Sequence, residues 1–178
     1  MTVRRRDFLI DACAGIAGVA AIGSGSWAHA SEARSLVFYH VHTAEKLKVV
    51  YREHGEVVAG AVDEINYFLR DFRTGEKHTM DVALLDSLSA IYDQFEHRGN
   101  FEVISGYRSP RTNAALRHVT TGVAKDSLHM FGRAIDVRLT SAATAELRDA
   151  AIAMRRGGVG YYPESNFVHI DTGTVRSW

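Results

Sequence analysis

The sequence predicts a single α+β domain with a mainly antiparallel sheet flanked by helices. Two observations predict this fold class. Short runs rich in β-branched and aromatic residues alternate with longer segments whose apolar residues recur at helical spacing. The chain has 178 residues, 46% of them hydrophobic, and no repeat or low-complexity tract divides it. One domain with its own core is therefore expected.

The first half of the chain is expected to contain strands at residues 36–42, 46–52 and 56–58. A helix is predicted over residues 64–72, where Ile65, Phe68, Leu69 and Phe72 have helical spacing. The clearest helix covers residues 81–97, because six apolar residues share one of its faces. These residues are Leu84, Leu85, Leu88, Ile91, Tyr92 and Phe95.

The second half opens with a strand at residues 101–105. Ser109 is then expected to cap a helix that has Pro110 in its first position and reaches about residue 118. A polar loop over residues 120–126 leads into a histidine-containing segment. The remaining pattern predicts a strand at 133–139, a helix at 142–156 and strands at 159–161 and 167–171.

Residues 1–30 are expected to be an export signal, and residues 31–178 the mature domain. The segment starts with consecutive arginines, continues with small and apolar residues, and ends at the cleavage pattern Ala28-His29-Ala30. Arg5 and Arg6, which precede an Asp-Phe-Leu sequence, resemble the twin-arginine type of signal. An ordinary Sec signal is the alternative. Either route predicts a bacterial periplasmic protein.

Composition excludes several other classes of protein. The formal net charge is zero, whereas nucleic-acid binders usually present a basic face or tail. No run approaches the ~18 apolar residues of a membrane span, so none is expected in the mature form. Cys13, the only cysteine, lies in the predicted signal, and the domain is therefore expected to have neither a disulfide nor a thiol nucleophile.

Three side chains form a candidate metal site: His129, Asp136 and His169. Gly132 allows a tight turn between the first two, and the small side chain of Ala134 leaves room beside Asp136. Each residue alone is more typical of a hydrogen-bonded structural role. Two imidazoles and a carboxylate together suit a catalytic zinc ion, which keeps its fourth position for water. A non-haem iron is the less favoured alternative.

The motifs around these residues resemble those of the D-Ala-D-Ala metallopeptidase superfamily. The chain reads Ser127-x-His129-x-x-Gly132-x-Ala134-x-Asp136, preceded by Ser105-Gly106-Tyr107-Arg108-Ser109 and followed by Val168-His169-Ile170-Asp171. This superfamily includes zinc D,D-carboxypeptidases, phage endolysin peptidases and the hedgehog signalling domain. Within it, the tail from Gly158 to Gly173 is most similar to the YcbK/MepK-type murein endopeptidases. The resemblance covers nearly the whole mature chain.

The resemblance implies a role for each matched residue. His129, Asp136 and His169 are implied to bind one zinc ion per chain. Arg108 matches an arginine that binds substrate oxygen and stabilises the tetrahedral oxyanion. Ser127 is expected to hydrogen-bond substrate or to hold its loop.

The general base is the point at which the chain departs from the pattern. Many relatives have a carboxylate three residues before the last histidine ligand, and this chain has Asn166 there. Asp171 shares a strand face with His169 and is the preferred candidate, either as base or as a carboxylate that orients this ligand. Glu164 is the other candidate, although an exposed loop acid is its ordinary interpretation.

The resemblance implies an exported zinc endopeptidase that cuts peptide cross-links of murein, the bacterial peptidoglycan. The bond would join D-Ala to meso-diaminopimelate or two diaminopimelate residues. Two alternatives remain: a D,D- or L,D-carboxypeptidase that trims stem peptides, and a non-catalytic zinc-containing murein-binding module. Aromatic residues that could flank a peptide groove are Tyr161, Tyr162 and Trp178.

Overall fold

The computed structural model describes residues 33–120 and 122–178. The predicted export signal, with Arg5 and Arg6, lies outside the described residues. Among the residues described, no helix has the length and apolar character needed to cross a membrane.

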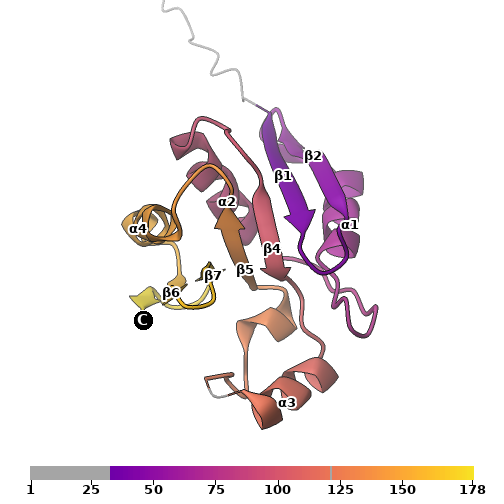
Figure 1. Ribbon diagram of the computed structural model, residues 1–178. Coiled ribbons are helices and arrows are strands. Elements are labelled where there is room, and N and C mark those ends of the chain that lie inside the picture. The colour runs from indigo at the N-terminus through magenta and orange to yellow at the C-terminus, as the bar shows by residue number, and fades with distance from the viewer. Residues whose placement is uncertain (1–32, 121) are drawn as a thin grey trace, which may run out of the picture.

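Within this part of the chain, eight strands form one sheet in the order β3-β2-β1-β4-β5-β7-β6-β8 (Figure 1). The strands are β1 (Arg34–His40), β2 (Lys46–Glu53), β3 (Glu56–Val57), β4 (Phe101–Ser105), β5 (Ala134–Leu139), β6 (Gly158–Tyr162), β7 (Phe167–Asp171) and β8 (Arg176–Ser177). Neighbouring strands are antiparallel except for β1 with β4 and β6 with β8. The predicted α+β fold with a mainly antiparallel sheet is confirmed, whereas the two-residue strand β8 was not predicted.

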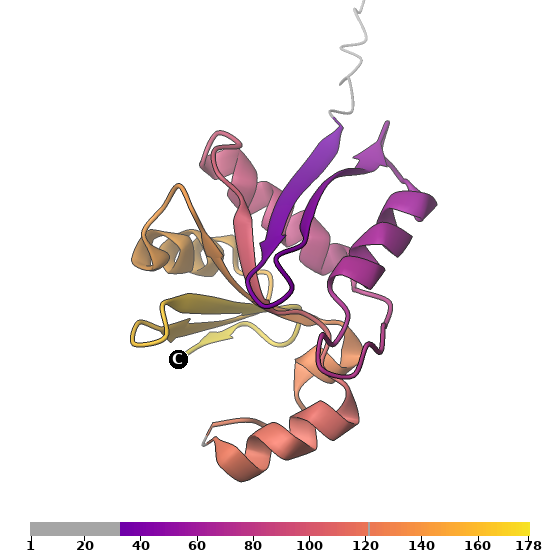
Figure 2. The same ribbon diagram turned by 45° about the vertical axis from the view of Figure 1, so that its right-hand side comes forward.

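Three helices pack on one face of the sheet. They are α1 (Ala59–Phe68), α2 (Val82–Gln94) and α4 (Thr144–Met154), which contact β2, β1 and β5–β7 respectively. The fourth helix, α3 (Pro110–Val119), lies beyond the strand ends and apart from the other three (Figure 2). The opposite sheet face is therefore free of α1, α2 and α4.

The strand sequences explain which face the helices cover. In β1, Leu36, Phe38 and His40 are buried, while Val37 and Tyr39, which alternate with them, are only half-buried. This alternation follows from the two-residue period of a strand. In β5, Ile135, Val137 and Leu139 point into the core, so Asp136 faces the other side of the sheet.

The helix predicted over residues 81–97 is present, with a shorter C-terminal end. The Asp81 side chain caps it by accepting a hydrogen bond from the Ala83 N–H at 2.9 Å. Its apolar face is buried as predicted. The helix ends at Gln94, because Glu96 and His97 adopt positive φ angles.

The helix predicted over residues 64–72 has wrong bounds. The structure has a helix at Ala59–Phe68, so it begins among small residues and ends before Leu69. Leu69 is fully buried although it is not helical, and its carbonyl accepts a hydrogen bond from the Tyr107 N–H at 2.7 Å. The apolar spacing therefore predicted that Leu69 is buried, but it did not predict that Leu69 lies outside the helix.

The predicted start of α3 is confirmed. Ser109 accepts a hydrogen bond from the Thr112 N–H at 3.2 Å, and Pro110 occupies the first turn. This placement matters for the site, because Arg108, which precedes α3, and the loop that follows α3 line the candidate catalytic cavity.

Candidate metal and active site

His129 is positioned by one turn of 3-10 helix, η1 (Leu128–Phe131), between α3 and β5. Gly132 ends this turn with a φ of 64°, and a Cβ at this position would overlap the Thr79 carbonyl oxygen. The predicted need for glycine here is confirmed. The His129 ring is buried, and its Nδ1 lies 2.7 Å from the Gly106 carbonyl oxygen, so Nδ1 is the protonated nitrogen.

Asp136 and His169 face each other across neighbouring strands. They are register partners on β5 and β7, which places both on the face of the sheet opposite the core. Asp136 Oδ1 lies 3.2 Å from His129 Nε2 and 2.9 Å from His169 Nδ1, and these two nitrogens are 3.2 Å apart. The fold thus brings together three side chains that are seven and thirty-three residues apart in the sequence.

The tautomers of the two histidines make this cluster suited to a metal ion. His129 Nδ1 donates to Gly106, and His169 Nε2 donates to Asp171 at 3.0 Å. When both rings are neutral, the inner nitrogens, His129 Nε2 and His169 Nδ1, therefore carry lone pairs, as does the carboxylate oxygen of Asp136. Three acceptors that face one another need a cation between them, so the donor set fits a metal ion.

The electrostatics of these three side chains lead to the same conclusion. Burial alone would lower the pKa of His169, but hydrogen bonds to Asp136 and Asp171 outweigh it and raise this pKa to about 9. Burial opposes ionisation of Asp136, yet its two histidine neighbours hold its pKa well below the usual range. These three side chains thus stabilise a positive charge between them, which either a proton on His169 or a metal ion can supply.

Asp171 orients His169 from the outer side. Its side chain is fully buried, and Oδ1 accepts from the Gly158 and Gly173 N–H groups at 2.9 and 2.8 Å. Oδ2 accepts from His169 Nε2 at 3.0 Å and from Arg176 at 2.7 Å. With every oxygen occupied by donors, the geometry of Asp171 supports an orienting role and not that of a base.

Arg108 contributes a buried positive charge beside the cluster. One guanidinium nitrogen lies 3.5 Å from Asp136 Oδ2 and 3.4 Å from Ser105 Oγ. Its Nε is buried and has no hydrogen-bond partner among the described residues. Arginine keeps its charge even though burial lowers its pKa. Unused donors next to the cluster can bind a carbonyl or carboxylate oxygen of a substrate.

A cavity of about 370 Å³ opens over these side chains. One wall is aromatic: Trp178 Nε1 donates to the Tyr162 hydroxyl at 2.9 Å, and the Trp178 ring centroid lies 5.4 Å from that of His169. Gly160 makes room for this wall, since a Cβ there would lie 2.7 Å from the indole ring. Tyr162 and Trp178, two of the three aromatic residues that could flank a peptide groove, thus line this cavity.

Other predicted site residues have different positions. Ser127 is buried and lines the cavity. Tyr161 faces α4 instead, where the Arg148 guanidinium carbon lies 4.6 Å from its ring centroid. Glu164 is exposed in the turn between β6 and β7 and is not among the residues lining the cavity. Asn166 has a φ of 51° and accepts a hydrogen bond from Thr144, away from the cluster.

One carboxylate that lines the cavity, that of Asp126, was not identified from the sequence. Asp126 lines the cavity together with Asp136, and it is the residue immediately before Ser127. It is exposed to solvent, unlike Asp171. Its position at the end of a polar loop did not indicate a role at the site, because acidic residues are common in loops. Only the fold of the loop places Asp126 at the cavity.

Comparison with known proteins identifies the family. The family model described as peptidoglycan L,D-endopeptidase MepK matches residues 28–178. The peptidoglycan L,D-endopeptidase MepK of Escherichia coli (strain K12) is 41% identical over 145 residues, which make up 82% of this chain and 80% of that protein. The probable peptidoglycan L,D-endopeptidase MepK of Haemophilus influenzae is 40% identical over 146 residues, 82% of this chain and 78% of the relative. The chain therefore belongs to the peptidoglycan L,D-endopeptidase MepK family, as the motif resemblance predicted.

Proposed function

We propose that this protein is an exported, zinc-dependent endopeptidase that hydrolyses peptide cross-links of murein. Membership of the family supports the reaction class, because the relatives are named peptidoglycan L,D-endopeptidases. One observation supports the metal assignment: an acceptor atom from each of His129, Asp136 and His169 lies within hydrogen-bond distance of the other two. Zinc is the metal that this donor set suits best.

The residues around the cluster supply the other requirements of amide hydrolysis. When bound, zinc polarises a substrate carbonyl and lowers the pKa of water. Arg108 binds the substrate carbonyl oxygen and stabilises the negative charge that develops on it, through its guanidinium, whose Nε has no hydrogen-bond partner among the described residues. Tyr162 and Trp178 hold the peptide against one wall of the cavity.

A proton must also move from the attacking water to the leaving amine. Asp126 is the candidate for this step, because it is the cavity carboxylate that is not a proposed metal ligand. The predicted candidates are less suited: Asp171 is saturated by donors, and Glu164 is not among the residues lining the cavity. An exposed carboxylate at the cavity can exchange its proton with solvent between turnovers.

The names of the relatives also distinguish between the two predicted bonds. An L,D-endopeptidase cuts between an L-centre and a D-centre. The diaminopimelate–diaminopimelate bond joins an L-centre to a D-centre, whereas D-Ala–diaminopimelate joins two D-centres. The diaminopimelate–diaminopimelate cross-link is therefore the proposed substrate. Because murein lies outside the cytoplasm, the proposal includes export by the signal in residues 1–30, through the twin-arginine route.

Digestion of defined cross-linked murein tests this function. The purified protein, its chelated form and the His129→Ala variant are incubated with murein of both cross-link types, and muropeptides and bound metal are quantified. We expect conversion of diaminopimelate-linked dimers to monomers by the zinc-loaded protein alone, and loss of zinc in the variant without loss of its helical signal. Full activity of a metal-free variant would overturn the site assignment. Bound zinc without cleavage of any muropeptide would favour the murein-binding module.

A further inference from the structure

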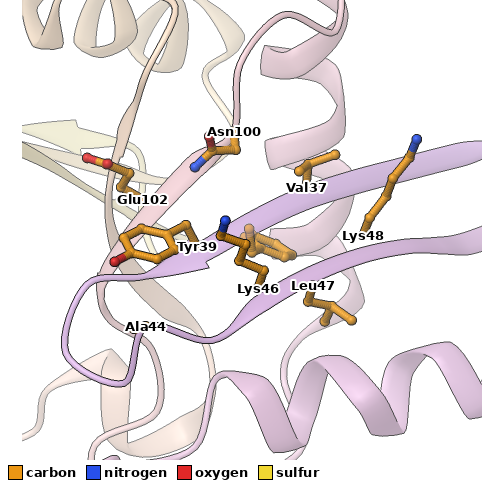
Figure 3. A pocket seen from close by; sticks show the side chains of 9 residues that line it. Val37, Tyr39, Ala44, Lys46, Leu47, Lys48, Asn100 and Glu102 are labelled. Atoms are coloured by element: carbon orange, nitrogen blue, oxygen red, sulfur yellow. The ribbon is translucent and has the colours of Figure 1, made fainter.

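A second and larger cavity lies on the helix-free face of the sheet, over β2, β1 and β4. It has a volume of about 700 Å³, and its lining includes Val37, Tyr39, Lys46, Lys48 and Glu102 (Figure 3). The two lysines extend on either side of Val37, and the Tyr39 ring lies at the end away from Lys48. The reaction proposed at the candidate metal site uses none of these residues.

The charges in this cavity do not balance. Glu102 is neutralised, because it forms an ion pair with Arg138 on the neighbouring strand. Lys46 and Lys48 are both exposed, and neither forms an ion pair with any residue that the structure describes. Although Lys46 also lines a neighbouring cavity with Glu45, Asp63 and Glu64, the two lysines thus have no ion-pair partner in the described part of the chain. Two such positive charges beside an aromatic ring attract anionic groups.

The strand register links this cavity to the candidate metal site formed by His129, Asp136 and His169. Lys46 pairs with Tyr39, Tyr39 with Glu102, and Glu102 with Arg138, so these four residues form one row across four strands. Arg138 lies two residues after Asp136 on β5, and both side chains point to the same face. The row thus runs from Lys46 to the strand that holds a proposed metal ligand.

The length of this path suits a peptide of a few residues. Strands lie about 4.8 Å apart and rise about 3.3 Å per residue, so the Cα atoms of Lys46 and Asp136 are separated by roughly 16 Å. An extended peptide covers about 3.5 Å per residue, and four or five residues therefore span roughly 14–18 Å. The distance therefore allows a peptide of this length, bound at His129, Asp136 and His169, to reach Lys46.

We propose that this cavity binds the murein stem peptide beyond the scissile bond, through the free carboxylates of its glutamate and diaminopimelate residues. Lys46 and Lys48 pair with these carboxylates, and the Tyr39 ring packs against the aliphatic diaminopimelate chain. This inference rests on the proposed function for its substrate. It adds a subsite that would favour the polymer over a short peptide carrying only the scissile bond.

Co-sedimentation with purified murein sacculi in the presence of a chelator tests the proposal, because binding is then measured without hydrolysis. We expect the Lys46→Glu/Lys48→Glu variant to bind about tenfold more weakly than the unchanged protein, since two attractions become repulsions. The same loss is expected when the unchanged protein is given murein whose carboxylates have been amidated. The Lys46→Arg/Lys48→Arg variant is expected to retain binding.

The matched control is Lys77→Glu/Arg155→Glu, which makes the same charge change at two exposed positions that do not line this cavity. Unchanged binding by the Lys46/Lys48 variant, or an equal loss in the control, would overturn the proposal. Failure of the proposed function has a different outcome: the zinc-loaded protein would not cleave murein, while lysine-dependent binding to sacculi would persist. Melting temperatures verify that all variants fold.

Discussion

Asp171 accepts a hydrogen bond from His169 Nε2 at 3.0 Å, on the side of the imidazole opposite Asp136. Because successive residues of a strand alternate between faces, His169 and Asp171 share a face of β7. Asp171 is itself held by Arg176 and by two backbone N–H groups, so its position is fixed. This contact determines that Nδ1 is the nitrogen of His169 that faces Asp136 and His129.

Replacing Asp171 by Asn is expected to weaken zinc binding about 10- to 100-fold, because an outer carboxylate orients the ligand and raises its basicity. Competition with a chromophoric chelator measures the affinity. Asp149→Asn is the control, since Asp149 lies on the exposed side of α4 and pairs with Arg148. Equal zinc affinities in all three proteins would show that Asp171 does not act on the ligand.

Replacing Arg108 by Ala is expected to reduce kcat about 10²- to 10³-fold while zinc stoichiometry stays unchanged, because one charged oxyanion donor is removed. Arg108→Lys should recover only part of the rate, since an ammonium group cannot reproduce the planar guanidinium. Steady-state kinetics and metal analysis provide the two readouts. If zinc were lost from the Ala variant, Arg108 would be a structural residue of the site.

Replacing Asp126 by Asn is expected to lower kcat about 10²-fold, with zinc retained, because proton transfer to the leaving amine loses its carboxylate. Glu164→Gln is the matched control from the exposed turn that follows β6, and its rate should be unchanged. A loss of rate in the Glu164 variant alone would reverse the assignment.

His40 is expected to make the fold sensitive to acid. It is fully buried, its Nε2 has no hydrogen-bond partner among the described residues, and Phe68 and Phe72 pack around it. Burial, and then the neighbouring His42, lowers its pKa to about 4. The folded state therefore resists a proton that the unfolded state accepts near pH 6.5, and stability falls as the pH drops from 6.5 towards 4.

The loss attributable to His40 is up to roughly 3 kcal/mol. Chemical denaturation at pH 7 and pH 4 measures it. The His40→Asn variant keeps an acceptor for the His42 N–H, which now bonds to His40 Nδ1 at 3.2 Å, and removes the titrating group. Its unfolding free energy should depend less on pH in this range. An identical pH dependence in both proteins would contradict the assignment.

Replacing Arg5 and Arg6 by lysine is expected to block export, because the twin-arginine route requires the arginine pair. Cell fractionation followed by immunoblotting locates the protein, and a reporter carrying a Sec signal provides the control. Unchanged delivery to the periplasm would indicate the Sec route.

Much of the fold could be predicted because its signals are local. The buried face of α2, the Ser109 cap of α3 and the turn at Gly132 each depend on residues within a few positions of one another. The bounds of α1 could not be predicted, since Leu69 is buried by a long-range contact with the segment at Tyr107. Periodicity cannot distinguish a buried helical residue from a buried residue that follows a helix.

The sequence by itself determined the candidate ligands, because the motifs around His129, Asp136 and His169 have fixed spacing, and it determined the family. Tertiary structure decided what their neighbours do. In the folded chain, Asp171 accepts a hydrogen bond from His169, Asp126 lines the cavity and Tyr161 contacts Arg148 on α4. These outcomes depend on strand pairing and loop closure between residues far apart in the chain, and such contacts leave no periodic pattern in the sequence.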